Sequence, residues 1–422
     1  MSDSTTPAAA QPTILPTRAD VCIIGGGMVG AALAALLAKS LEDREIVLVE
    51  AFALPNSAQT FFQPSFDDRS TAIAAGSVEL LQRIGVWDQL REHATPIRQV
   101  HVSDKGHFGG SLISASEVDL DAVGYVVANA WLGRVLLSHL RKQHNVRLIS
   151  PAKVSQLKPQ ANGAELILEV NQQSHTLRTQ LAIIADGAES PLRERLGIDV
   201  RREDYQQTAI IANVRFDQPH QGVAYERFTD QGPMALLPLG GNDRAQESAL
   251  VWTQPNHSAE ALLAMSDADF LQQLQTRFGH RLGHFTQVGR RDSYPLQLIV
   301  ASEQVRSSIA VMGNAAHFLH PVAGQGFNLA LRDCATLCAQ LKQAGDQPLG
   351  TLTLLQSYLQ LQQQDQQTTI GFSHLLTKLF SSDALPAAAL RALGFLGLEL
   401  VPSAKQFLVN QTMGRSARGV RL

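Results

Sequence analysis

The chain has 422 residues, of which 45% are hydrophobic and 17% are charged, and its formal net charge is −3. This composition predicts a folded protein, and the length favours two interleaved domains over one small core. The weakly acidic balance shows no clustered basic face, so we expect no nucleic-acid partner. Three cysteines, an odd and sparse number, argue against a disulfide framework and favour a reducing, cytoplasmic location.

The N-terminal residues 1–17 are rich in Pro, Thr and Ala, which predicts a disordered lead-in and no signal peptide. No apolar run reaches the roughly 18 residues of a transmembrane helix. The nearest approach is Ala384–Val401, which Pro386, Arg391 and Glu399 interrupt. That stretch predicts an amphipathic or core helix instead.

A strand, a glycine cluster and a helix follow one another near the N-terminus. The apolar strand Val21–Ile24 leads into Gly25-x-Gly27-x-x-Gly30 and an Ala/Leu-rich helix, and a second strand ends in Glu50. The glycines allow a tight turn, close approach of a pyrophosphate, and close packing of the helix on the strand. The helix N-terminus attracts phosphate, and an acid at Glu50 can bind both ribose hydroxyls. The pattern predicts a Rossmann-like dinucleotide site that favours FAD or NAD over NADP.

Two arginines could each be a solvated charge or a cofactor contact. Arg69 follows Asp67 and Asp68 in a loop, and Arg134 lies early in an amphipathic helix expected over Ala128–Gln143. The residues alone leave both choices open.

The middle of the chain changes from helical to strand-like patterns. Residues 145–181 alternate with period two and predict antiparallel strands. A buried strand then ends at Asp186-Gly187, and Ser190-Pro191 predicts the start of a helix. An acid at such a strand end could contact a ribose or phosphate, although Asp-Gly alone is only a turn signal.

Residues 201–300 predict a separate antiparallel sheet with one helix near Asp267–Phe278. Such a sheet can wall a substrate pocket with apolar side chains. The candidate lining residues, each of which could also be sheet core, are Tyr205, Tyr225, Phe228, Met234, Leu236, Trp252 and Tyr294.

A second glycine-rich loop lies between Val311 and Asp333 and repeats the strand–loop–helix order of the first. It contains Gly313-Asn314, His320-Pro321 and Gly324-x-Gly326. In the helix after it, Cys334 and Cys338 are four residues apart, and we interpret them as buried small side chains in preference to a metal or redox pair. No metal site is expected.

The order of these motifs resembles that of the single-component FAD-dependent aromatic hydroxylases, the para-hydroxybenzoate hydroxylase class, over about residues 18–380. Within that class the chain is similar to the ubiquinone-biosynthesis hydroxylases, through the segments "HVSDKGHFG", "IANV", "YERFT" and "GNAAHFLHPVAGQGFNL". The resemblance implies an α/β fold in which a Rossmann-like FAD-binding domain is interleaved with an antiparallel-sheet substrate domain and followed by a C-terminal helical segment. The expected ranges are 18–200 and 301–365 for the FAD-binding domain, 201–300 for the substrate domain and 366–422 for the helical segment.

The resemblance also implies roles for individual residues. Gly25, Gly27 and Gly30 would hold the FAD pyrophosphate and Glu50 the adenosine ribose, with Arg69, Arg134 and Asp186 as further FAD contacts. Asp186 would also help to order a transient nicotinamide cofactor.

In the late loop, Gly313-Asn314 stands where the family usually has Gly-Asp. The amide of Asn314 can still donate and accept hydrogen bonds, but it lacks the carboxylate charge. The backbone at Gly326, Phe327 and Asn328 would face the flavin pyrimidine, where the helix dipole stabilises negative charge. Pro321 and the segment from Val322 to Gly324 would form the wall where oxygen adds. His320 could assist deprotonation of a phenol, or it could be structural.

The implied reaction is ring hydroxylation of a polyprenylated phenol. NAD(P)H would reduce FAD transiently, and O2 would add at flavin C4a to form the hydroperoxide that transfers oxygen. The C-terminal segment could dock on the inner-membrane surface, on partner subunits or on a second copy of the chain. The alternatives are hydroxylation at another ring position, a prenyl-chain reductase, an amine-type oxidase, and a non-catalytic flavin-binding scaffold. Sequence cannot distinguish NADH from NADPH.

Overall fold

The computed structural model describes residues 15–54, 67, 69–104, 110–240, 245–321, 324–380 and 413–414. The expected lead-in therefore lies outside the described residues except for residues 15–17. Of the expected C-terminal helical segment, residues 366–380 form the end of one long helix, and almost all of the rest lies outside the described residues.

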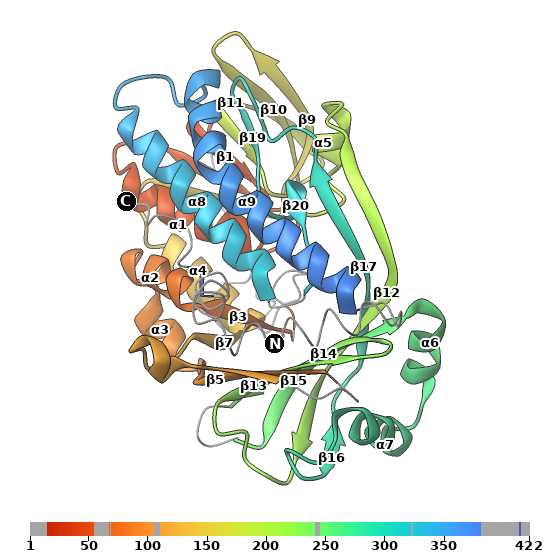
Figure 1. Ribbon diagram of the computed structural model, residues 1–422. Coiled ribbons are helices and arrows are strands. Elements are labelled where there is room, and N and C mark those ends of the chain that lie inside the picture. Colours follow the sequence, from red (N-terminus) through yellow and green to blue (C-terminus); the bar gives the residue numbers. More distant parts are fainter. Residues whose placement is uncertain are drawn as a thin grey trace, which may run out of the picture.

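The first sheet carries the Rossmann-like core (Figure 1). Its strand order is β18 (Val305–Arg306), β19 (Ile309–Val311), β11 (Gln173–Ile184), β1 (Arg18–Ile24), β2 (Ile46–Val49) and β8 (Val146–Ile149). Strands β19, β11, β1, β2 and β8 are parallel neighbours. Two further strands, β9 (Lys153–Gln160) and β10 (Gly163–Val170), extend the antiparallel first half of β11.

Helices and antiparallel strands cover the two faces of this sheet. One face packs against α1 (Met28–Ser40), α4 (Asn129–Leu140), α8 (Gln325–Gln343) and α9 (Leu352–Phe380). Figure 1 shows α8 and α9 lying side by side across the front of the sheet. The opposite face packs against β9 and β10. Burial on both faces explains the continuous apolar runs of β1 and β2.

One strand of the predicted antiparallel region pairs differently. Residues 146–149 form β8, which pairs in parallel with β2, and the antiparallel strands begin only at β9. The prediction was wrong here because α4 crosses over the sheet and returns the chain in the same direction as β2, a long-range connection that periodicity does not reveal.

The second sheet has the order β20 (His317–Phe318), β17 (Asp292–Ala301), β12 (Val200–Phe216), β15 (Glu247–Pro255), β14 (Gly232–Leu239), β13 (Val223–Thr229), β5 (Gln99–Asp104) and β6 (Gly110–Ser114), with β16 (Phe285–Val288) beside β12. Its outer face packs on α6 (Asn256–Ala264) and α7 (Asp267–Phe278). The helix expected over 267–278 is therefore confirmed. The sheet is not confined to residues 201–300, because β5, β6 and β20 join it and β5 runs parallel to β13.

A small third sheet and short helices connect the two. Strands β3 (Ser70–Ala74), β7 (Gly124–Ala128) and β4 (Thr95–Ile97) form the third sheet, with α2 (Ala75–Arg83), α3 (Trp87–Arg91) and the single turn η1 (Ala115–Val118) between its strands in the sequence. A second single turn, η2 (Gly313–Ala315), lies between β19 and β20. The predicted start at Ser190-Pro191 is confirmed in α5 (Pro191–Arg195), where Ser190 Oγ accepts a hydrogen bond of 3.1 Å from the Arg193 amide.

Helices of the described part of the chain lack the combination of length and apolar composition that crossing a membrane requires. All three cysteines are buried, and burial raises the pKa of each thiol above its ordinary value. For Cys334 and Cys338 this agrees with the interpretation as small core side chains.

Candidate functional site

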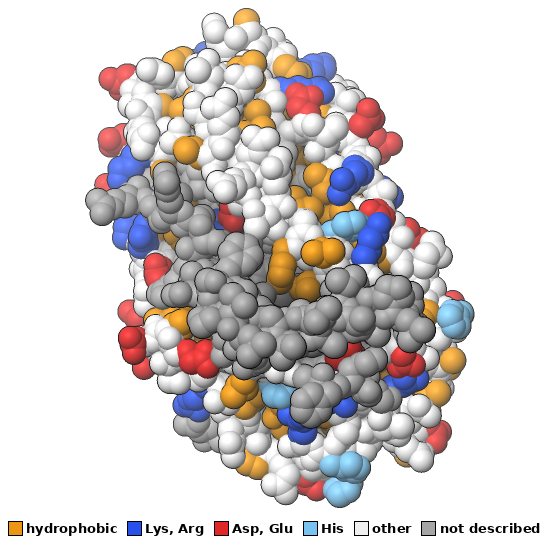
Figure 2. Space-filling model, viewed as in Figure 1, with side chains coloured by type: hydrophobic (Ala, Val, Ile, Leu, Met, Phe, Trp, Pro, Cys, Tyr) orange, Lys and Arg blue, Asp and Glu red, His pale blue; other side chains and the backbone are white. Residues whose placement is uncertain are grey.

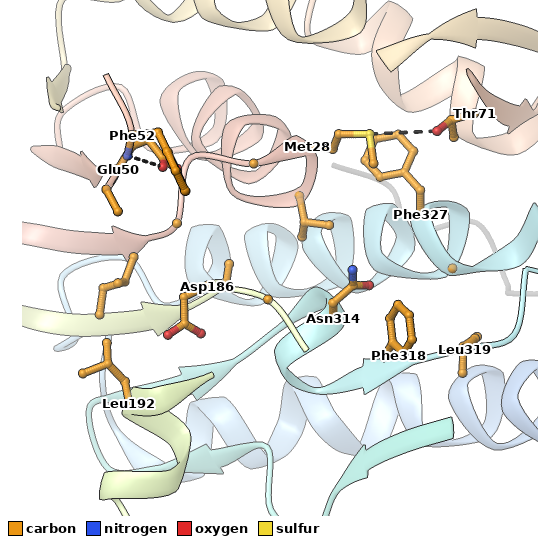
Figure 3. Close-up of a pocket in the computed structure, with 18 of the residues that line it drawn as sticks. Met28, Glu50, Phe52, Thr71, Asp186, Leu192, Asn314, Phe318, Leu319 and Phe327 are labelled. Carbon is orange, nitrogen blue, oxygen red and sulfur yellow. Dashed lines mark hydrogen bonds between the residues drawn. The ribbon is translucent and has the colours of Figure 1, made fainter. Parts of the chain in front are cut away.

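A cavity of about 620 Å³ runs along the carboxyl ends of the parallel strands. This is a volume typical of small-molecule and cofactor sites, at the sheet edge where open α/β folds bind their ligands. Figure 3 shows Glu50 and Phe52 at one end, Asp186 and Asn314 in the middle, and Phe327 with Thr71 at the other end. The cavity thus connects the two glycine-rich segments of the sequence.

The first glycine cluster forms one end of the cavity. Gly25 and Gly27 line it directly. Gly30 lies below, and a Cβ there would stand 1.8 Å from the Gly25 carbonyl oxygen, so only glycine lets α1 pack so closely on the turn. No side chain caps α1 at Gly27, so its first amides remain available to an anion in the cavity.

Glu50 is buried at the end of β2 and orders the same turn. Its Oε2 accepts a hydrogen bond of 2.6 Å from the Gly26 amide, and its Oε1 accepts one of 2.8 Å from the Phe52 amide. A carboxylate has about four acceptor positions, so Glu50 can hold the turn and still accept from a ligand hydroxyl. Glu50 is among the residues that line the cavity, and its predicted contact with a ribose stays a prediction.

Asp186 lines the middle of the cavity directly after β11. Burial raises the pKa of its carboxyl above the ordinary value, and the Ser190 hydroxyl partly opposes this rise. Its Oδ1 is buried, and no described residue forms a hydrogen bond with it. A buried acceptor of this kind is costly unless a partner satisfies it, so the geometry favours a ligand donor at this point.

Asn314 extends an exposed side chain into the cavity between Asp186 and Phe318, as Figure 3 shows. It sits on η2, which begins at Gly313, a glycine in the left-handed conformation at φ 60°. Arg193 of α5 braces this turn, because its Nη1 donates a hydrogen bond of 2.7 Å to the Ala315 carbonyl. The amide of Asn314 is therefore presented to a ligand from a rigid support.

The N-terminus of α8 forms the other end of the cavity. Gly324, at φ 59°, precedes the helix without any side-chain cap, and Gly324, Gly326 and Phe327 line the cavity. The N-termini of α1 and α8 thus face the same space. The backbone of Asn328 was predicted to face the flavin, and this contact stays a prediction. The Asn328 side chain has other partners: its Nδ2 donates to the Ala72 and Gly324 carbonyls, and its Oδ1 accepts from the Ala74 amide. Its side chain fixes α8 to β3.

Beneath the late loop lies a buried polar network that the sequence analysis missed. His317 Nε2 lies 2.6 Å from Asp333 Oδ2, while Asp333 Oδ1 accepts hydrogen bonds from Gln362 at 2.7 Å and Gln366 at 3.0 Å. The signal was present as a polar stripe at helical spacing along α9, namely Gln362, Gln366, Thr369, Ser373 and Thr377, all buried. This network connects β20 to α8 and α9.

His320 and Pro321 line the cavity beside the α8 N-terminus. His320 is buried, and burial lowers its pKa to about 4, so the ring is neutral at physiological pH. Its ring meets that of Tyr205 edge-on, with centroids 5.5 Å apart, and its carbonyl accepts a hydrogen bond of 3.4 Å from Ser373 Oγ. Val322 and Ala323, the rest of the expected wall before Gly324, lie outside the described residues.

The two candidate arginines occupy different positions. Arg69 places its guanidinium carbon 4.6 Å from the centre of the Tyr294 ring and forms an ion pair with Asp67. Arg134 is exposed on α4, 5.7 Å from the Trp131 ring centre. Neither is among the residues that line this cavity, and contact of either arginine with FAD stays a prediction.

The predicted substrate residues divide between the two faces of the second sheet. Trp252, Met234 and Leu236 belong to the core beneath α7, and Tyr225 packs edge-on to Phe278 of that helix. These four face away from the cavity because side chains alternate along a strand, which corrects their assignment as lining residues. The remaining three are Phe228 and Tyr294, on the inner face by strand register, and Tyr205, beside His320.

Several residues that line the cavity were not predicted. Met28 and Thr71 approach each other there, with Sδ and Oγ1 3.9 Å apart. Leu237 and Val251 bring the inner face of the second sheet to the cavity wall. Strand register, which is set over long distances, places these side chains, so local sequence offered little signal.

Comparison with known proteins agrees with this architecture. Residues 18–360 match the protein family described as FAD binding domain. Ubiquinone hydroxylase UbiL of Rhodospirillum rubrum is 36% identical over 402 residues, which cover 94% of this chain and 90% of that protein. The 3-demethoxyubiquinol 3-hydroxylase of Escherichia coli is 30% identical over 398 residues, or 94% of this chain and 98% of that protein.

Among solved structures, p-nitrophenol 4-monooxygenase PnpA from Pseudomonas putida superposes with a TM-score of 0.76 at 18% identity, covering 96% of this chain and 100% of that chain. PqsL from Pseudomonas aeruginosa superposes with a TM-score of 0.73 at 20% identity, covering 88% of this chain and 99% of that chain. These likenesses establish a shared fold.

Proposed function

This chain belongs to the ubiquinone-biosynthesis hydroxylases of the FAD binding domain family, and on that premise we propose that it hydroxylates the ring of a polyprenylated phenol, of the 2-octaprenyl-6-methoxyphenol type. It is an FAD-dependent monooxygenase that uses NAD(P)H and O2. The observation that carries the proposal is a single cavity that joins both glycine-rich segments and reaches the inner face of the second sheet.

The residues around the cavity fit FAD. Asp186 Oδ1 lacks a hydrogen-bond partner among the described residues, and the amides at the start of α1 and α8 are open to anionic groups. Glu50 at one end suits the ribose of the adenosine, and Asn314 in the middle suits the polar chain between pyrophosphate and ring. When bound, FAD supplies electron transfer from NAD(P)H and activation of O2.

The residues of the chain would position the cofactor and the substrate, exclude water from the cavity and stabilise negative charge there. The α8 N-terminus directs its dipole toward the end of the cavity that meets the second sheet, where it stabilises negative charge. Leu237, Val251 and Phe327 supply apolar walls there and exclude water. His320 is neutral, because burial lowers its pKa to about 4, so it adds no positive charge to this wall.

Metabolite analysis of a deletion strain tests the proposed substrate. We expect loss of ubiquinone and accumulation of a prenylated phenol that lacks one ring hydroxyl, and the missing position identifies the reaction. In parallel, the purified protein with FAD should consume one O2 for each hydroxylated phenol. Normal ubiquinone in the deletion strain contradicts the proposal, while a protein that binds FAD but consumes no O2 with the phenol would instead be the non-catalytic flavin-binding scaffold.

We also propose that the enzyme takes its polyprenyl substrate from the membrane surface. Leu361 and Leu375 on α9 are 59% and 61% exposed, and Figure 2 shows hydrophobic side chains gathered near the end of that helix. Exposed apolar side chains of this kind favour an interface. Co-sedimentation with vesicles of bacterial lipids should fall in the double variant Leu361→Ser, Leu375→Ser, and unchanged co-sedimentation would leave a partner protein or a second copy as the occupant.

A further inference from the structure

Glu226 is a carboxylic acid on the inner face of the second sheet, the face that borders the cavity. Strand register places it directly opposite Ala235 of β14, and Ala235 is opposite Val251 of β15. Residues paired in this way project on the same side of a sheet. Val251 lines the cavity, so Glu226 lies on the same side about two strand spacings, roughly 10 Å, from it.

The neighbours of Glu226 place it between the cavity and α9. Two residues further along β13, Phe228 packs with Val102 and Leu376, the latter on α9. One turn earlier on α9, Ser373 bonds to the carbonyl of His320 at the cavity wall. Leu237, diagonal to Glu226 on the neighbouring strand, lines the cavity itself. The region between these contacts adjoins the end of the cavity that receives the α8 N-terminus.

The side chain of Glu226 is deep in the protein and still accessible. Its exposure is intermediate, yet burial raises the pKa of its carboxyl to about 8. Strand register places the side chain on the cavity side of the sheet, beside Leu237, which lines the cavity. Among the described residues, Asp104 of β5 shares its face of the sheet, whereas Arg227 and His101 point to the opposite face by alternation. Arg69 and Tyr294 lie toward the opposite side of the second sheet, at β17. None of these charged or titratable groups contributes to the altered pKa, whose cause is burial alone.

On the basis of the proposed function, we propose that Glu226 accepts the hydroxyl proton of the phenolic substrate. The O–H bond of the phenol breaks, the proton passes to a Glu226 carboxylate oxygen, and the electron pair stays on the phenolate. The phenolate oxygen enriches the ring carbons ortho and para to it, which receive the electrophilic oxygen atom. The attacked ring carbon then loses its hydrogen as a proton, which neutralises the anion left by the oxygen donor. Glu226 returns its own proton to the ring oxygen as the ring becomes a phenol again.

The pKa of Glu226 lies closer to that of a phenol than the pKa of His320 does, which favours Glu226 as the base that deprotonates the substrate. A phenol has an ordinary pKa of about 10, while burial gives pKa values of about 8 for Glu226 and about 4 for His320. Transfer of the proton to Glu226 is therefore more favourable than transfer to His320 by about four orders of magnitude. A base is most effective when its pKa lies near the operating pH.

The variant Glu226→Gln keeps the shape of the side chain and removes the base, and the exposed glutamate Glu260 on α6 gives the matched control Glu260→Gln. With FAD bound, we expect Glu226→Gln to lower kcat/KM for a short-chain prenylated methoxyphenol by about 100-fold or more. In the wild type, kcat/KM should rise with pH through an apparent pKa near 8. In Glu226→Gln this rise should be absent. Glu226→Asp should retain the rise at a shifted pH.

A binding measurement separates the proton-accepting role from a structural one. The chromophore p-nitrophenol reports its own ionisation by its yellow phenolate. At neutral pH we expect a larger phenolate fraction when it is bound to wild type or Glu260→Gln than to Glu226→Gln, with the flavin spectrum unchanged. Equal phenolate fractions and parallel pH profiles in wild type and Glu226→Gln would overturn the inference. If the wild type itself neither binds phenols nor hydroxylates them, the proposed function fails instead.

Discussion

His317 Nε2 lies 2.6 Å from Asp333 Oδ2, and both side chains are buried. This contact joins the late glycine-rich loop to the middle of α8, and Gln362 and Gln366 join the same carboxylate to α9. A buried polar network with several mutual hydrogen bonds restricts the arrangement of its members. The loop that carries Asn314 is therefore fixed from below, while its upper side faces the cavity.

Replacing Asp333 with alanine should destabilise the protein strongly. The change leaves His317 and two glutamine amides without their common acceptor, and losing one member of a buried charged or hydrogen-bonded group costs about 3 kcal/mol or more. Urea unfolding should show this loss, together with weaker FAD binding as the loop loosens. Asp346→Ala, at an exposed position before α9, is the control and should change stability by less than about 0.5 kcal/mol. Equal stability of both variants would show that the network is dispensable.

Replacing Asn314 with alanine should weaken FAD binding without unfolding the protein. The side chain is exposed to the cavity, so its loss removes one ligand hydrogen bond, worth about 1 kcal/mol or roughly fivefold in Kd. Quenching of flavin fluorescence measures the Kd. The control Asn162→Ala, in the exposed turn before β10, should bind FAD as the wild type does. Asn314→Asp tests charge: an unaltered Kd would mean that acceptor oxygens alone suffice at this position.

Two glycine-to-alanine changes should have opposite effects on stability. At Gly30 the new Cβ would meet the Gly25 carbonyl oxygen at 1.8 Å, so α1 must move away from the turn, at a cost of about 3 kcal/mol or more. At Gly371 a Cβ meets nothing within 4 Å, and alanine should raise stability by about 0.5–1 kcal/mol within a helix. Thermal unfolding of both variants checks the contrast, and a tolerated Gly30→Ala would contradict the packing described for the first glycine turn.

Glu226 should make the stability of the protein depend on pH. Burial raises its pKa in the folded protein from about 4.5 to about 8, so folding favours the protonated form. Between these values the unfolded chain ionises while the folded protein holds its proton, and stability therefore falls as pH rises through that window. Above pH 8 the variant Glu226→Gln should be more stable than the wild type, by up to about 5 kcal/mol, and near pH 4 the two should be equal. Parallel unfolding curves at both pH values would show that the carboxyl is not buried.

Features fixed by neighbouring residues could be predicted from the sequence. The glycine turn at Gly25, the placement of Glu50 and the start of α5 at Ser190 each depend on contacts within a few residues of the chain or on one strand–helix unit. The pairing of β8 with β2 and the entry of β5 into the second sheet depend on distant segments. Local alternation does not encode them.

The sequence did not reveal which face of the second sheet borders the cavity, and this was the main error in predicting the residues that contact the substrate. Along β13, Tyr225 was selected as a lining residue, whereas the adjacent Glu226 is the one that faces inward. The sequence showed the aromatic residues of β13 and their alternation. It did not show which set of alternate residues faces the cavity, and a shift of one residue exchanges the inner and outer faces of a strand. The His317–Asp333 contact joins residues from different elements, and only the polar stripe of α9 pointed to a partner.

The last described turns of α9 contact the second sheet. His374 bonds to the Tyr205 hydroxyl, Lys378 forms an ion pair with Glu203, and Leu376 reaches Phe228. The same helix is anchored on the first sheet through Leu355 and Tyr358. A chain ending before residue 370 would keep the adenosine end of the cavity. It would lose the contacts of α9 with the second sheet, which fix the orientation of that sheet relative to the first sheet. Such a chain should therefore take up flavin normally and yet oxidise NAD(P)H without hydroxylating a phenol.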